Sequence, residues 1–319
     1  MVTRRSITDS EIRCVSVSQT MLLRVMSCGA AVLITFAVPL ASAEDVMPAR
    51  TDCRYPSIQT TGSSAPAKQA RGIALPQDDV FRSLTADPKQ PQFVTSYQRI
   101  RYRDVNQSIN AGVVAFGETF GLYGHRDGNC NGLQVGIQGG VFAQFNLDAP
   151  SRDLINADYI VGFPVTWRQG PFSARVRLYH QSSHLGDDFL LDNPGINRID
   201  FRFEEVEGLM SVDLAWLRLY GGGGYLLHSD PVLQRGKVQW GIELRPPASA
   251  SPLFRDVIED LHMAPIVAAD FKTLEEQGWN LNANVVAGLE WYQPGSTRRL
   301  RALLSYYHGF NPYGQFFNQ

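Results

Sequence analysis

Eleven segments of alternating apolar and polar residues follow one another between residues 92 and 309, and this pattern limits what the chain can fold into. Each segment is 10–14 residues long and ends near Gly, Pro, Asn or Asp. Alternation with a period of two residues is typical of β-strands that bury one face. The pattern predicts an all-β protein with strands at 92–102, 109–122, 132–145, 156–168, 172–182, 197–210, 214–227, 236–245, 262–273, 279–292 and 299–309. One short helix is expected within 251–260.

The length of these segments favours a transmembrane antiparallel β-barrel over a soluble sandwich. Soluble strands average about 5–6 residues, whereas a tilted strand needs about 9–11 residues to cross a bilayer. In 172–182, Val176 and Leu178 share one face while Arg175 and Arg177 share the other. We assign the apolar face to lipid and the charged face to the lumen. Aromatic residues near strand ends fit interfacial girdles: Tyr97, Tyr159, Trp167, Tyr179, Trp216, Trp240, Trp279, Trp291 and Tyr292.

The segment 197–210 is assigned in the same way. Ile199, Phe201 and Phe203 are expected to face lipid. A lumen charge network is expected from Arg175, Arg177, Arg202, Asp200, Glu204 and Glu243.

The strand count predicts a barrel of about 12 strands. Bacterial single-chain barrels have an even number of strands, and eleven segments are visible. We therefore expect that the last strand is missing from the end of the sequence; the alternative is that one strand has been split or overlooked.

The N-terminal region carries a targeting signal. Arg24 precedes an apolar run, and Ala41-Ser42-Ala43 fits a cleavage site. We expect a signal peptide at 1–43, a periplasmic extension at 44–91 and the barrel at 92–319, in the outer membrane of a Gram-negative-type bacterium. Residues 1–43 carry four Arg and two acidic residues, so the net charge of −2 for the whole chain becomes about −4. Nucleic acid is not expected as a partner; outer-membrane lipid is, and a homodimer is left open.

The cysteine count predicts one disulfide. Of the four Cys, Cys14 and Cys28 leave with the signal peptide, and Cys53 and Cys130 remain. In the oxidising compartments of exported proteins, such a pair of thiols forms a disulfide. With both termini periplasmic, Cys130 and the extension that carries Cys53 lie on the same side. The 183–196 loop then lies outside the cell.

Three stretches resemble a family of bacterial outer-membrane barrels known only as a domain of unknown function. They are residues 79–93, residues 180–188 and residues 311–316. The resemblance covers most of the mature chain and implies a barrel without assigning an activity.

A second, local resemblance is to outer-membrane phospholipase A. That family has a His-x-Ser pair on one strand and an Asn-Arg pair on the next, which His180, Ser182 and Asn197-Arg198 match. The residues after Ser182 and the spacing to Asn197 differ from that family. The resemblance implies a lipid-ester hydrolase.

Strand parity places this candidate site independently. His180 and Ser182 are two residues apart and share the face assigned to lipid. A hydrolase would use Ser182 as nucleophile, His180 as general base and Asn197 to orient the imidazole. Asp187 and Asp188 could hold Ca²⁺, the only cofactor expected, and only for a hydrolase. The alternative is that these polar side chains simply lie at the level of the lipid headgroups, on a non-enzymatic pore or structural barrel.

Overall fold

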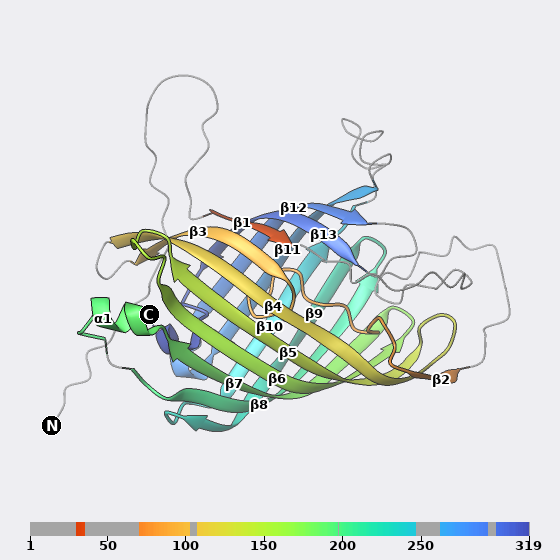
Figure 1. Ribbon diagram of the computed structural model, residues 1–319. Helices are drawn as coiled ribbons and strands as arrows, with labels where there is room; N and C mark the ends of the chain where they lie inside the picture. Colours follow the sequence, from red (N-terminus) through yellow and green to blue (C-terminus); the bar gives the residue numbers. More distant parts are fainter. Residues whose placement is uncertain are drawn as a thin grey trace, which may run out of the picture.

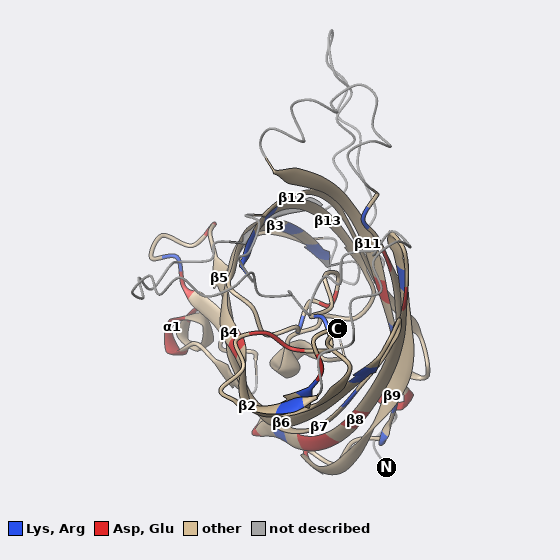
Figure 2. Ribbon diagram, turned by 90° about the vertical axis from the view of Figure 1, so that its right-hand side faces the viewer, with Lys and Arg blue, Asp and Glu red and all other residues tan. Residues whose placement is uncertain are grey.

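The computed structural model describes residues 30–35, 70–102, 107–196, 198–246, 262–292 and 298–318. Its strands are antiparallel and curve around a central lumen (Figures 1 and 2). The strands are β1 (Ala30–Thr35), β2 (Arg71–Ala74), β3 (Val94–Tyr102), β4 (Gln107–Arg126), β5 (Gly132–Asn146), β6 (Leu154–Gln169), β7 (Phe172–Leu185), β8 (Phe201–Leu214), β9 (Leu217–Asp230), β10 (Gly236–Leu244), β11 (Met263–Leu274), β12 (Leu281–Tyr292) and β13 (Arg299–His308).

All eleven predicted strands are confirmed as β3–β13, with ends that differ by a few residues. One helix of six residues, α1 (Asp187–Asp192), occupies a stretch expected as a loop. Single 3-10 turns occur at Glu275–Gln277 and Gly314–Phe316. The helix expected within 251–260 lies outside the described residues. No described helix is long and apolar enough to cross a membrane.

The strands β3–β13 do not close the sheet by themselves. Consecutive strands pair from β3 through β13, but no described pair joins β13 to β3. The short β1 lies between them, so that Leu33 is opposite Leu303 on β13 and Ser96 on β3. Thus β1 is the twelfth strand around the lumen. The position expected for a strand beyond β13 is taken here by part of the predicted signal segment.

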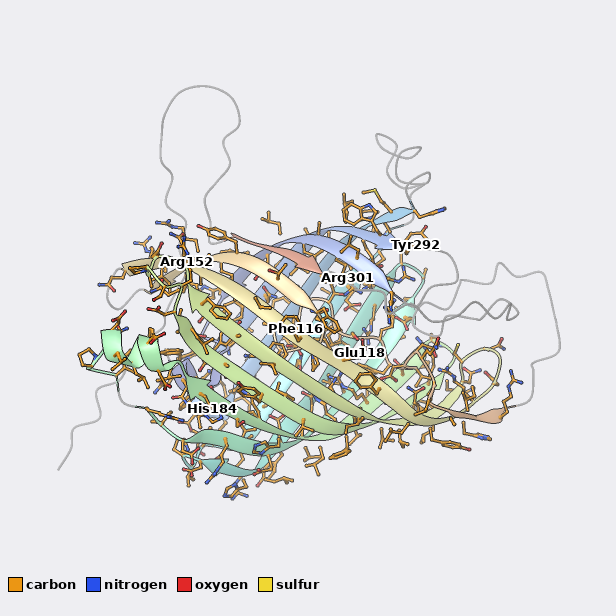
Figure 3. All side chains as sticks on the ribbon, in the orientation of Figure 1. Phe116, Glu118, Arg152, His184, Tyr292 and Arg301 are labelled. Carbon is orange, nitrogen blue, oxygen red and sulfur yellow. The ribbon has the colours of Figure 1, made fainter. Side chains whose placement is uncertain are left out.

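The two faces of β7 agree with the prediction. Arg175 and Arg177 are 4% exposed and point into the lumen, whereas Val176 is 54% exposed on the outer face. Other outward-facing apolar side chains are also more than half exposed, including Phe116 (Figure 3), Phe163, Met210 and Leu304. The barrel therefore has an apolar exterior and a charged interior.

The assignment of faces on β8 was wrong. Phe201 is buried and Phe203 half-buried, both toward the lumen, whereas Arg202 and Glu204 face outward. Phe201 lies 5.0 Å from the Phe317 ring, and Phe203 lies 5.8 Å from the Tyr179 ring, measured between ring centroids. These rings turn inward because the lumen is filled with protein at this level and offers them apolar contacts.

The lumen is occupied by Pro76–Pro91, which we call the lumen segment. The sequence predicted residues 44–91 as a periplasmic extension, but this part of it lies within the sheet (Figure 2). Leu84 and Val80 are fully buried. Phe81 and Leu84 pack on the inner face of β8 and β9, and Ala86 packs on β11, β12 and β13. An extended chain with apolar side chains at these positions thus serves as the barrel's core.

Candidate functional site

The predicted pair His180 and Ser182 does lie on the outer face of β7. Both side chains are partly exposed, and they alternate with the buried Tyr179, Gln181 and Ser183. His184 shares this outer face and lies 5.7 Å from the Tyr159 ring (Figure 3). Strand parity therefore placed His180 and Ser182 correctly.

The partner of His180 is a carboxylate that the alternating pattern had assigned to the lumen. His180 Nδ1 lies 2.7 Å from Glu204 Oε1 on β8, and His228 Nδ1 on β9 lies 3.0 Å from the other oxygen of Glu204. Glu204 faces outward through the ordinary alternation of β8, between the inward-facing Phe203 and Glu205, and the register shift opposite β9 pairs it with His228. In the described part of the chain, no hydrogen bond joins His180 to Ser182.

Asn197 lies outside the described residues, so its predicted role stays a prediction. It was expected on the outer face because it is in phase with Phe201 and Phe203, and both of these face the lumen. Strand β8 also begins only at Phe201. Strand parity therefore no longer supports an outward-facing Asn197.

The predicted calcium ligands Asp187 and Asp188 are exposed in the first turn of α1. Among the described residues, no group of three or more His, Cys, Asp or Glu side chains could hold a metal ion. Calcium binding stays an untested prediction.

Cys130 is buried and disulfide-bonded, in the turn between β4 and β5. Its predicted partner, Cys53, lies outside the described residues, so the pairing of these two residues also stays a prediction.

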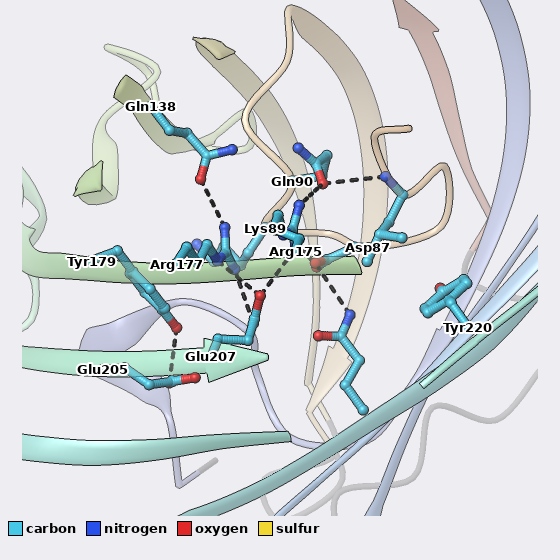
Figure 4. Close-up of polar contacts among 12 residues, drawn as sticks. Asp87, Lys89, Gln90, Gln138, Arg175, Arg177, Tyr179, Glu205, Glu207 and Tyr220 are labelled. Atoms are coloured by element: carbon cyan, nitrogen blue, oxygen red, sulfur yellow. Dashed lines mark hydrogen bonds and ion pairs between the residues drawn. The ribbon is translucent and has the colours of Figure 1, made fainter. Parts of the chain in front are cut away.

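A dense ionic network lines the lumen and was only partly predicted. Glu207 on β8 is its centre (Figure 4). Arg175 Nη2 lies 3.0 Å, Arg177 Nε 2.8 Å and Lys237 Nζ 2.9 Å from its carboxylate oxygens. Glu207 is 1% exposed. The sequence marked the two arginines and Glu243 as lumen groups but not Glu207 or Lys237. Glu207 and Lys237 are adjacent in sequence to the outward-facing Val206 and Val238. This alternation could have predicted that both charged side chains face the lumen.

The lumen segment is fixed to the wall by charged and polar contacts as well as by packing. Lys89 Nζ lies 2.5 Å from Asp158 Oδ2 on β6, and Asp87 forms an ion pair with Lys272 on β11. Nearer the middle of the segment, Arg82 Nη2 lies 2.6 Å from Asp213 Oδ1 on β8. Figure 4 shows Asp87, Lys89 and Gln90 among the side chains of the wall.

Backbone atoms of the lumen segment are also bonded to the wall. The Thr85 amide donates to Glu243 over 2.8 Å, and Asn284 donates to the Ala86 carbonyl over 2.7 Å. Since an unpaired buried peptide group is costly, these contacts favour the segment in this position.

Burial shifts the pKa values of Asp87 and Lys89, two of the charged groups of this segment, in different directions. Burial alone would raise the pKa of Asp87, but the Lys272 ammonium and the Lys89 amide lower it to about 2. Burial lowers the pKa of Lys89, and the Asp158 carboxylate opposes that change. The Asp87 carboxylate is therefore ionised at neutral pH, which keeps its ion pair intact.

The C-terminal residues 309–318 cap one end of the lumen (Figure 2). The Gly314 amide lies 3.1 Å from Asp158 Oδ2, the same carboxyl group that binds Lys89. Lys89 Nζ also lies 3.9 Å from the Tyr313 ring centroid. Gln315 donates to the carbonyl oxygens of Ser183 and Ile199. The lumen segment and this cap meet at Asp158, so two separate stretches of chain obstruct the same passage.

Comparison with known proteins gives a family and no activity. The model of a protein family described as a protein of unknown function (DUF1207) matches residues 31–319. The chain belongs to this family. No curated protein matches it. Among solved structures, it is similar to OccK5 (OpdH) of Pseudomonas aeruginosa, with 11% identity, 75% of this chain and 76% of that chain covered, and a TM-score of 0.24.

Proposed function

We propose that this member of the DUF1207 family is a non-enzymatic outer-membrane β-barrel whose lumen is closed to free diffusion by the lumen segment. The observation that carries this proposal is the burial of Pro76–Pro91 inside the ring of strands, held there by Asp87, Lys89 and Arg82. Passage of a solute would require this segment to move.

The outer surface supports the membrane location. β6 and β7 have 16 and 14 residues, longer than the about 9–11 residues that a tilted crossing requires. Their outward positions are mostly apolar, while their inward positions carry Arg, Asp, Gln and Ser. A soluble barrel would have the reverse arrangement, since burial of apolar surface drives its folding.

Conductance across planar bilayers tests the closed lumen. The wild-type protein should give no stepwise current. A variant in which Pro76–Pro91 is replaced by a Gly/Ser linker of equal length and the cap residues 309–318 are deleted should give steps, because both obstructions of the lumen are then removed. The cold and heated electrophoretic mobilities of both proteins check that each is folded. Large regular steps from folded wild-type protein would overturn the proposal.

A second candidate is the lipid-ester hydrolase, and one observation favours it. The 2.7 Å contact between His180 Nδ1 and Glu204 is the carboxylate–imidazole pair that orients a general base. Ser182 would be the nucleophile on the same outer face, and Glu204 would take the role first assigned to Asn197.

Phospholipid hydrolysis by refolded protein, with and without Ca²⁺, tests this second function. A hydrolase requires that Ser182→Ala abolish fatty-acid release while Ser183→Ala, on the lumen face, retains catalysis if it folds. Equal release by wild type and Ser182→Ala would reject it.

A further inference from the structure

A cavity of about 130 Å³ remains in the lumen beside the lumen segment. Its walls are the inner faces of β3, β4, β5, β12 and β13, and the C-terminal cap contributes Asn311–Tyr313. The ionic network around Glu207 lies elsewhere, since neither Glu207 nor its cationic partners line this cavity. The cavity adjoins a second lumen cavity of about 150 Å³, with which it shares Asn284, Tyr307 and Asn311 and which Arg177 and Lys237 line.

Two buried polar atoms in this wall have no hydrogen-bond partner among the residues that the structure describes. They are Gln144 Oε1 on β5 and Ser96 Oγ on β3. Gln144 is 1% and Ser96 is 8% exposed, and both line the cavity. A buried polar atom without a partner costs roughly 1–3 kcal/mol. Two such atoms on one cavity indicate a site completed by a molecule that brings hydrogen-bonding groups.

The remaining uncharged lining combines aliphatic, amide, hydroxyl and aromatic groups, with Val94, Ile100, Val113 and Ala115 supplying the aliphatic surface. Gln98, Asn284 and Ser305 supply polar groups, and Phe142, Tyr307 and Tyr313 supply rings. An aromatic ring has an apolar face that suits the C–H surface of a sugar ring, while amides suit its hydroxyls.

The charged groups that line the cavity already have partners. Asp87 is bound by Lys272 and Gln239. Arg99 is exposed, and its Nη1 lies 3.4 Å from Asn110 Oδ1, while Arg101 also has a partner. The buried part of the cavity therefore offers hydrogen bonds without an unpaired charge, which favours an uncharged ligand.

From these observations we infer that the cavity is a binding site for a small neutral polyhydroxylated solute of the size of a monosaccharide. A ligand hydroxyl donates to Gln144 Oε1, a second hydroxyl bonds to Ser96 Oγ, and the sugar ring packs on the aromatic side chains. The inference goes beyond the closed barrel of the proposed function, since binding in detergent does not depend on conductance.

Equilibrium dialysis of the refolded full chain against D-glucose tests this inference, with D-gluconate as the charged analogue. D-glucose should bind saturably and more tightly than gluconate. Gln144→Leu should weaken glucose binding about tenfold, the loss of one hydrogen bond. Ser96→Ala should weaken it several-fold.

Gln181→Leu is the matched control for these variants. Gln181 is an inward-facing, buried glutamine on β7 that lines a different lumen cavity of about 150 Å³. It should leave glucose binding unchanged, and the heated and unheated mobilities of all variants report their folding. Absence of saturable glucose binding to folded wild type, a preference for gluconate, or equal binding by folded Gln144→Leu would each overturn the inference. None of these results bears on the conductance test.

Discussion

Glu204 and Glu207 are three residues apart on β8, and this odd spacing places them on opposite faces of the barrel wall. Glu207 is 1% exposed and forms ion pairs with three cations inside the lumen. The Glu204 side chain is 38% exposed and meets only His180 and His228 among the described residues. The free-energy consequence of losing each carboxylate should differ accordingly, because Glu204 is partly exposed at its contacts whereas Glu207 is enclosed among buried cations.

We therefore expect Glu207→Gln to lower the free energy of unfolding by roughly 3–5 kcal/mol, the usual effect of leaving buried charge uncompensated. Glu204→Gln, the matched control, should cost less than about 1 kcal/mol. Urea-induced unfolding of protein refolded in vesicles measures both. A small effect of Glu207→Gln would mean that the network in the lumen is hydrated.

Gly117 on β4 leaves room for Pro91 of the lumen segment. A Cβ atom at Gly117 would lie 2.8 Å from Pro91 Cβ and 2.9 Å from its Cα. We expect Gly117→Ala to cost roughly 1–3 kcal/mol of stability, as overpacked cores do. Gly208→Ala is the control, because a Cβ atom added at Gly208 would meet no described atom within 4 Å. Equal thermal unfolding of the two variants would show that Pro91 moves aside freely.

At the level of elements, the sequence predicted the positions of the strands well. It predicted less reliably which side chains face the lumen and which face outward. Period-two alternation located β3–β13, and the faces of β7 followed from Arg175 and Arg177 against Val176. The same rule failed on β8, because alternation shows which residues share a face and not what that face meets. Phe201 and Phe203 were indistinguishable from lipid-facing residues until the filled lumen gave them a partner.

The candidate site was predictable only in part for the same reason. His180 and Ser182 were placed by parity within one strand. Glu204 came from the neighbouring strand, where the pairing register of β7 and β8 places it opposite His180. That register has no signal in a single sequence. The folding of Pro76–Pro91 into the lumen likewise depends on contacts with residues far along the chain.

The seam between β3 and β13 leads to a prediction about a chain from which the predicted signal peptide has been removed. Removal of residues 1–43 takes away β1, so the facing backbone groups of β3 and β13 lose their described partners. Amide hydrogens of Val94–Tyr102 and Arg299–His308 should then exchange faster than those of β7, which is paired on both sides. Hydrogen–deuterium exchange on a chain that starts at Glu44 measures this. Equal protection of β3 and β7 would contradict it.

The whole molecule turns an apolar surface outward and a charged one inward. Val176 is 54% exposed in the middle of β7, at a position assigned to lipid. Val176→Arg should therefore reduce the stability of the protein folded in vesicles by roughly 2–4 kcal/mol.

Val232→Arg provides the control for this substitution. Val232 is 92% exposed in the connection between β9 and β10, outside the strands. Its replacement should change stability by about 0.5 kcal/mol or less. If both variants behave alike in vesicle-based unfolding, the exterior of β7 does not contact lipid.

The position of the lumen segment also sets the order of assembly. Ala86 and Asn284, which share a hydrogen bond, are 198 residues apart in the chain. Such distant contacts form slowly, because a long loop must close before they can contribute. The segment is translated before every strand from β3 onward, but its binding surface is complete only when β13 is in place. The lumen segment is early in the chain but can dock fully only after the late strands have formed. The last strands to pair therefore enclose it.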